Sequence, residues 1–216
     1  MALIFDAFLD AAELAADVVC DSRVAGFWEL PSVLEGYTVG GLAGHLFHAT
    51  ERLRQVLEAD PPPPSPPARI ADYYGLNRID TPADLDQAFH RAVRDAGSRI
   101  AEQGAEELGA RFTALVTSLR STLPGIDPGR LVPVILGDGR PSRLDDYVAT
   151  RVVELLVHSD DLAVSAGMPE IAMPPSSADI AIEALVLVAR ARHGDVAVLR
   201  ALARRERSNA EILRVL

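Results

Sequence analysis

Apolar residues recur every three to four positions along four long stretches of this chain. This period limits the possible folds more than any other feature of the sequence. The stretches are 3–22, 38–58, 81–119 with a break expected near Gly104, and 142–165. A period of 3.6 residues places the apolar side chains on one face of a helix. A helix with one apolar face has to bury that face against another element. We therefore predict an all-α protein built on a four-helix bundle.

Capping residues and prolines mark the expected ends of these helices. Thr38 is a predicted N-cap for the second helix, Thr81 followed by Pro82 predicts the start of the third, and Ser142 is a predicted N-cap for the fourth. The proline-rich segment 61–67 predicts a stiff, long crossover between the second and third helices. A ligand for a proline-binding module is the alternative for this segment.

Two further parts of the chain complete the expected architecture. Apolar residues at 131–136, followed by Gly-Asp-Gly, predict a short hairpin near 131–141. After a Gly- and Pro-rich break that begins at Gly167, the tail predicts one or two more helices. We expect 1–166 to form the bundle and 167–216 a small helical C-terminal extension.

The charge balance excludes some classes of function. Lys and Arg number 21 against 31 Asp and Glu, a formal net charge of -10, whereas nucleic-acid binding needs a concentrated basic face. The longest apolar stretch, 184–189, is too short to span a bilayer, and the N-terminus lacks the pattern of a signal peptide. We expect a cytoplasmic protein with neither a nucleic-acid nor a membrane partner. A homodimer remains open, with a role for the arginine-rich tail.

A polar stripe runs beside the apolar face of the fourth predicted helix. Its members are Tyr147, Arg151, Glu154, His158 and Asp161, spaced four, three, four and three residues apart, which aligns them along one edge of the core. Polar groups half inside a bundle cost free energy unless they are paired or bind a ligand. Glu154 and His158 lie one turn apart, so both could reach a single metal ion. An ion pair between Arg151 and Glu154 is the alternative.

The second predicted helix offers a third metal ligand. At 100° per residue, His45 lies roughly 70° from the centre of the apolar stripe and His48 roughly 130° from it. His45 is therefore the better inward-facing ligand. Two imidazoles and one carboxylate suit zinc and leave a coordination position open. Nickel, cobalt or iron would also be accepted by this donor set.

Three stretches, 28–32, 36–46 and 151–162, resemble a known family. They are similar to the metal-binding domain of the mycothiol-dependent maleylpyruvate isomerases, within the DinB-like superfamily of four-helix bundles. That family places its metal on a His early in the second helix and on a Glu-x-x-x-His in the last one. The resemblance, which covers about 1–166, thus implies the same ligands, His45, Glu154 and His158.

The resemblance also implies a chemistry. A low-molecular-weight thiol such as mycothiol would be the cosubstrate, activated as a thiolate at the metal and attacking an electrophile in S-transfer, conjugation or isomerisation. His48 or Asp161 could orient a ligand imidazole, and Arg151 could hold an anionic substrate group. A structural salt bridge is the alternative for each of them. The family's C-terminal domain supplies an active-site arginine, which this sequence does not let us assign to Arg190, Arg192 or Arg200.

Other functions remain open at this point. The chain could be a non-catalytic metal- or ligand-binding bundle, or its site could bind no metal. A fourth ligand from the tail, His193 or Asp195, would close the coordination sphere and favour a structural role. Cys20 is expected to be a buried, inert thiol and not a ligand.

Overall fold

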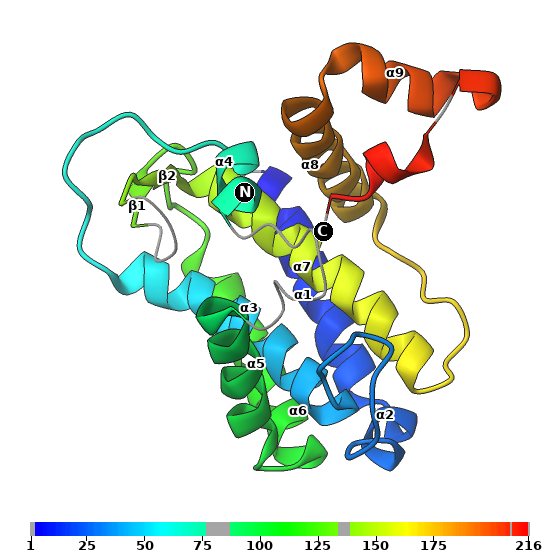
Figure 1. Cartoon of the computed structure of the whole chain (residues 1–216). Helices are drawn as coiled ribbons and strands as arrows, with labels where there is room; N and C mark the ends of the chain where they lie inside the picture. The colour runs from blue at the N-terminus through cyan, green and yellow to red at the C-terminus, as the bar shows by residue number, and fades with distance from the viewer. Residues whose placement is uncertain (1–2, 77–86, 134–138, 208, 216) are drawn as a thin grey trace.

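The fold is a ring of four long helices. The computed structural model describes residues 3–76, 87–133, 139–207 and 209–215. The ring consists of α1 (Leu3–Cys20), α3 (Val39–Glu58), α6 (Ala105–Thr122) and α7 (Leu144–Ser165) (Figure 1). Helix α1 contacts α6 and α7, and α3 contacts the same two helices, so the ring closes on itself. The all-α class and the bundle are thereby confirmed.

The core of the ring is drawn from all four helices. Phe8, Leu42, Phe112 and Leu155 are fully buried, one from each helix. Burial of each such side chain contributes about 1.5–3 kcal/mol. The predicted apolar face of the last bundle helix is also fully buried, and it consists of Leu144, Val148, Val152, Leu155, Ser159 and Leu162.

The predicted limits of the second bundle helix are confirmed. The Thr38 hydroxyl oxygen accepts a hydrogen bond of 3.0 Å from the Gly41 amide, which caps α3. Beyond Glu58 the proline-rich crossover leads into α4 (Ile70–Leu76), a short helix that contacts α7 and α8. The sequence did not predict α4, because seven residues are too few to show a period.

The third predicted helix is divided into two helices at the break expected near Gly104. They are α5 (Ala88–Ala101) and α6, separated at Gly104, whose φ of 86° is a conformation that glycine adopts without strain. Only α6 belongs to the ring, because α5 packs mainly on α3. The helix start expected at Thr81 lies outside the described residues.

The expected hairpin is present but very short. Strands β1 (Leu131–Val132) and β2 (Ser142–Arg143) pair antiparallel, with Val132 opposite Ser142. The prediction that Ser142 caps the last bundle helix is wrong. Ser142 is buried in β2, and the N-cap position is taken by Arg143 without a side-chain cap. A loop carbonyl satisfies the first amide of the helix instead: the amide of Leu144 donates to the carbonyl of Arg130.

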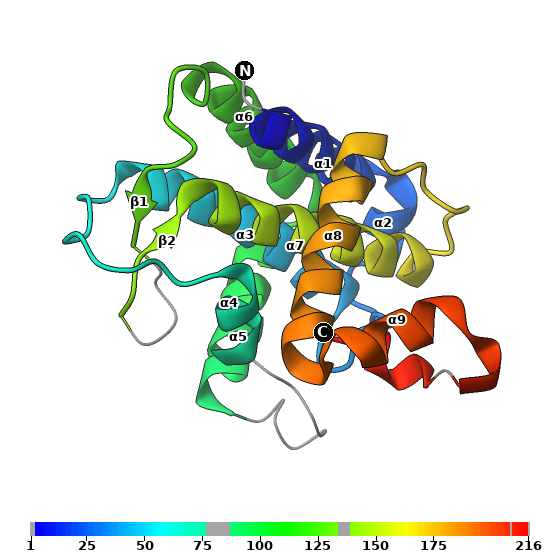
Figure 2. The same ribbon diagram turned by 90° about the horizontal axis from the view of Figure 1, so that it is seen from above.

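The C-terminal extension packs on the bundle. It comprises α8 (Pro175–His193), α9 (Asp195–Ala203) and the 3₁₀ turns η2 (Arg205–Arg207) and η3 (Ala210–Leu213). Helix α8 crosses α7 and also contacts α1 and α4 (Figure 2). The Ser177 hydroxyl donates a hydrogen bond of 2.7 Å to the Ala7 carbonyl. The chain then returns, so that Val215 is buried.

Cys20 departs from its prediction. It is exposed, because α1 ends at this residue and its neighbours Val18 and Val19 occupy the core-facing positions before the chain enters α2 (Ser22–Gly26). As for membranes, the described helices include none with the length and apolar character to cross a bilayer.

Candidate metal centre

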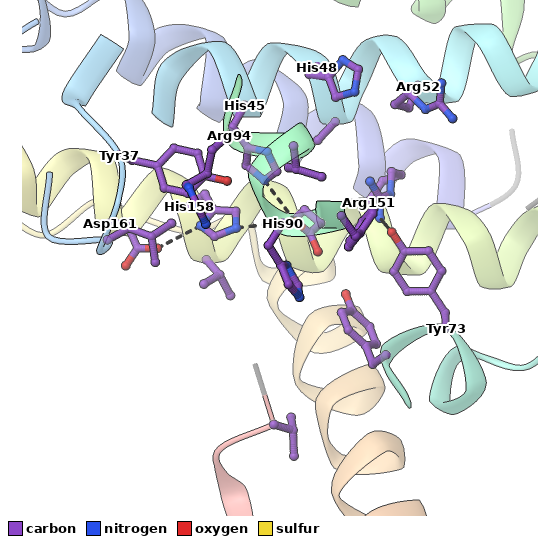
Figure 3. A pocket seen from close by; sticks show the side chains of 18 of the residues that line it. Tyr37, His45, His48, Arg52, Tyr73, His90, Arg94, Arg151, His158 and Asp161 are labelled. Carbon is purple, nitrogen blue, oxygen red and sulfur yellow. Dashed lines mark hydrogen bonds and ion pairs between the residues drawn. The ribbon is translucent and has the colours of Figure 1, made fainter. Parts of the chain in front are cut away.

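Two facing helices bring together three potential ligands that are far apart in sequence. His45 comes from α3, and Glu154 and His158 come from α7. Figure 3 shows the two histidines side by side. One ligand atom from each lies within 4.8 Å of the other two. The Nε2 atoms of His45 and His158 are 3.4 and 3.5 Å from the same Glu154 oxygen, Oε2. The side chains are only 12, 17 and 17% exposed in the order His45, Glu154 and His158.

The spacing and the donor atoms fit a small divalent ion. Nitrogen and oxygen ligands lie about 2.0–2.1 Å from zinc, so two ligand atoms at a tetrahedral angle are about 3.4 Å apart. The two separations from Glu154 Oε2 match this value. Across the described ranges, no other His, Cys, Asp or Glu side chain joins the three. His193 is exposed, and Asp195 pairs with Arg190 at 2.7 Å.

Asp161 lies where an orienting group for His158 is expected. It follows His158 by one turn of α7, and its Oδ2 is 3.0 Å from His158 Nδ1, on the opposite side of the ring from Glu154. A carboxylate in this position fixes the tautomer and the plane of a ligand imidazole.

His48 shows no comparable contact. It lines the cavity one turn beyond His45, and no described residue shares a hydrogen bond with its ring. His45 Nδ1 is buried, and the described residues give it no hydrogen-bond partner. The orienting role predicted for His48 therefore stays a prediction.

Burial and close contacts separate the proton affinities of the three groups. Burial lowers the pKa of His45 more than the nearby Glu154 raises it. Burial would also lower the pKa of His158, but hydrogen bonds to Asp161 and Glu154 outweigh it and raise the value to about 9. Burial would raise the pKa of Glu154, but the two imidazoles and Arg151 hold it well below its usual range. At neutral pH the metal-free cluster thus holds one imidazolium and one carboxylate.

Metal affinity should therefore rise with pH. Because His158 must lose its proton to become a ligand, each pH unit below about 9 should weaken apparent metal binding about tenfold. Chelator-competition titrations at several pH values up to about 9 would measure the slope. A flat profile would show that His158 does not exchange a proton for the ion.

Removal of the Asp161 carboxylate should also weaken metal binding. Asp161→Asn is expected to cost about 10–100-fold in affinity, the usual effect of losing an orienting partner. The comparison belongs at a pH of about 9, where proton competition at His158 is small. Asp160→Asn is the matched control, because its neighbouring carboxylate contacts no ligand imidazole. Equal losses in the two variants would contradict an orienting role.

A cavity of about 440 Å³ lies beside the cluster, which is within the size range of small-molecule sites. Its walls come from α3, α4, α5, α7 and α8 and from the loop before α3. Away from the cluster the lining is aromatic and basic. The basic lining residues are Arg52, Arg94, Arg151 and Arg192.

Arg151 is a buried cation on this wall. It is only 6% exposed, its Nη2 donates to the Tyr73 hydroxyl, and its Nε donates to the Thr150 hydroxyl at 3.2 Å. The guanidinium carbon lies 5.3 and 5.1 Å from the ring centroids of Tyr73 and Tyr147. No carboxylate of a described residue is within ion-pair distance, so the expected alternative, a pair with Glu154, does not form. A buried cation that makes no direct ion pair with a described residue is suited to an anionic ligand.

The C-terminal extension reaches the same cavity through Arg192 at the end of α8. Its Nη2 donates a hydrogen bond of 3.0 Å to the carbonyl of Tyr74, and the Tyr74 hydroxyl donates to the carbonyl of Thr150 at 3.3 Å. Helix α4 thus links Arg192 to α7. Of the three arginines considered from sequence, Arg192 lines the cavity, whereas Arg190 and Arg200 are exposed elsewhere. No sequence signal could have selected it, because only tertiary packing places it there.

Tyr37, which precedes the α3 cap, also lines the cavity. Burial and the Glu154 charge raise the pKa of its hydroxyl to about 12 against the opposing effect of Arg94. The hydroxyl therefore keeps its proton at neutral pH. No sequence pattern singles Tyr37 out, although it lies inside one of the stretches that resemble the family.

Together these features define a class: a helical bundle with an open His/Glu/His cluster beside a cavity of small-molecule size. Comparison with known proteins narrows this further. The chain belongs to the mycothiol maleylpyruvate isomerase N-terminal domain family, whose model matches residues 8–163. The crystal structure of the mycothiol-dependent maleylpyruvate isomerase has a similar fold, with a TM-score of 0.52 and 14% identity over 84% of this chain and 68% of that chain. No curated protein sequence matches the chain.

Proposed function

We propose that this protein is a metal-dependent enzyme that uses a low-molecular-weight thiol, mycothiol or a relative, for S-transfer, conjugation or isomerisation. The observation that carries the proposal is the open three-ligand cluster beside the cavity. Membership of the family supports the thiol. Zinc is the proposed ion, and nickel, cobalt or iron would fit the same donors. We place the activity in the cytoplasm, where thiols are kept reduced.

Each part of the site has a task in this proposal. His45, Glu154 and His158 would hold the ion, and Asp161 would keep the His158 ring in its binding orientation. A bound divalent ion would lower the pKa of the thiol, so that a thiolate is present at neutral pH. The cavity would hold the electrophile close to that sulfur and restrict water.

Arg151 would bind an anionic group of the electrophile. Arg151→Gln should raise KM about 10–100-fold for an electrophile that carries a carboxylate, because a hydrogen bond to a charged group is lost. KM for a neutral electrophile of similar size should change little. Steady-state kinetics with the two substrates would separate these effects. Equal changes for both would mean that Arg151 is structural, supporting Tyr73 and Tyr147.

The proposal is tested by thiol consumption. Zinc-loaded protein is incubated with mycothiol, bacillithiol or glutathione and a panel of electrophiles, and loss of free thiol is measured over time. The His45→Ala variant, prepared in the same way, is the control for uncatalysed reaction. Enzyme-dependent loss with one thiol is expected. No loss with any pair would favour the second candidate function.

That second candidate is a non-catalytic metal- or ligand-binding bundle. One observation favours it: Glu154 contacts both imidazoles and Asp161 contacts His158, so these groups can satisfy one another's charges. Metal analysis of protein purified without a histidine tag distinguishes the cases. One equivalent of metal without turnover supports a binding module, and no metal at all overturns the metal centre.

A further inference from the structure

The Tyr37 side chain is held beside the candidate metal centre by the loop before α3. Its ring centroid is 5.7 Å from that of His45, and the two rings are tilted by 57°. The His45 ring in turn lies 4.9 Å from that of His158. In Figure 3 the Tyr37 hydroxyl points towards His45 and away from the loop backbone. The hydroxyl group thus faces the side of the cavity that contains the cluster.

The loop is fixed at several points, so this orientation is set before a ligand binds. The Ser32 amide donates to the Tyr37 carbonyl at 2.9 Å, and the Tyr37 amide donates to the Leu34 carbonyl at 3.2 Å. The Val33 amide donates to the Ser165 hydroxyl at 2.9 Å, which ties the loop to the end of α7. A donor held rigidly in this way needs no reorganisation when its acceptor arrives.

Tyr37 is partly buried, and among the residues that the structure describes its hydrogen bonds are made by its backbone, not by its hydroxyl. A tyrosine hydroxyl in a partly buried cavity wall is available to donate a hydrogen bond to a ligand. The neighbouring charges are Glu154 and Arg94. Glu154 Oε2 is already shared by two imidazoles. An acceptor on a bound ligand would complete the hydrogen bonding of the hydroxyl.

We propose that the Tyr37 hydroxyl donates a hydrogen bond to the thiolate sulfur held at the open side of the His45–Glu154–His158 cluster. This inference rests on the proposed function, because it requires a thiol at that position. Tyr37 is then a binding residue for the thiol and not only a wall of the cavity. The hydrogen bond favours the thiolate over the thiol, since only the thiolate sulfur is a strong acceptor.

The test compares binding of a neutral thiol to cobalt-loaded wild type and Tyr37→Phe. The probe is 2-mercaptoethanol, which has no anionic group for the arginines, and the readout is the sulfur-to-cobalt charge-transfer absorption. Tyr37→Phe keeps the ring contact with His45, so cobalt content should be unchanged. Affinity for the probe should fall about tenfold, and the pH midpoint of binding should rise. Tyr147→Phe, the same change at another cavity tyrosine, should leave probe affinity as in the wild type.

The outcomes distinguish the role of Tyr37 from the proposed thiol chemistry. Equal probe affinity and pH midpoint in wild type and Tyr37→Phe would overturn the role of Tyr37 while leaving the thiol site intact. A fall in cobalt content would also overturn it, because Tyr37 would then act by supporting His45. Absence of probe binding in wild type would overturn the proposed thiol chemistry and this inference with it.

Discussion

Glu154→Ala should bind zinc more than about a hundredfold more weakly than the wild type. Loss of an orienting partner alone costs about 10–100-fold, and here a ligand itself is removed. Glu154 is also the group that both imidazoles approach, through a single oxygen at 3.4 and 3.5 Å. Its removal therefore takes away the central ligand and leaves two histidines, which do not make a three-ligand site. Zinc content after dialysis and chelator-competition titration would measure the loss.

Glu51→Ala is the matched control for this change. Glu51 also lies on a bundle helix, but it pairs with Arg54 and does not line the cavity. Its replacement should leave zinc content at the wild-type level. Both variants should keep the helical circular dichroism of the wild type. Stoichiometric zinc in Glu154→Ala would show that the ion, if one binds, is held elsewhere.

The second large effect is expected at the crossing of α3 and α5. A Cβ at Gly44 would lie 2.1 Å from the carbonyl oxygen of Gly97, and a Cβ at Gly97 would lie 2.6 Å from that of Gly41. Both obstacles are backbone, so the helices would have to separate. Gly44→Ala and Gly97→Ala should each lower the free energy of unfolding near the upper end of the about 1–3 kcal/mol that overpacking costs. Urea unfolding would measure the change.

Gly97→Ala should also weaken zinc binding, because the added Cβ would lie 3.1 Å from the backbone nitrogen of His45. Gly75→Ala is the control: Gly75 lies in α4, and no atom of a described residue is within 4 Å of the Cβ position. There alanine should raise stability by about 0.5–1 kcal/mol, since glycine inside a helix is entropically unfavourable. Similar effects at the three positions would contradict the close helix crossing.

The parts of the fold that the sequence predicts are those specified by local chemistry. The α3 start at Thr38 follows from a side-chain cap, and the buried face of α7 follows from its period. The juxtaposition of Glu154 and His158 needs only one helical turn. His45 is a harder case, since it meets them across 109 residues of sequence, but its angle to the apolar stripe already points it inward.

The parts that the sequence does not predict depend on tertiary contacts. Ser142 has the chemistry of an N-cap, yet pairing with Val132 places it in a strand instead. Helix α5 is amphipathic like α6, but it lies outside the ring and packs on α3 where glycines allow a close helix crossing. Arg192 enters the cavity only because α8 folds back across α7 and α4.

The packing of α8 on the bundle limits how far this chain can be shortened. The segment matched by the family model stops at residue 163, but Ala181, Ala184 and Val188 of α8 are buried against what precedes them. A fragment trimmed to the matched segment would expose the apolar surface that α8 covers, and exposed apolar surface promotes self-association. It would also lack Arg192 and Val215, so its small-molecule chamber would stand open on one flank. Packing of the tail on the bundle thus also completes the wall of the chamber.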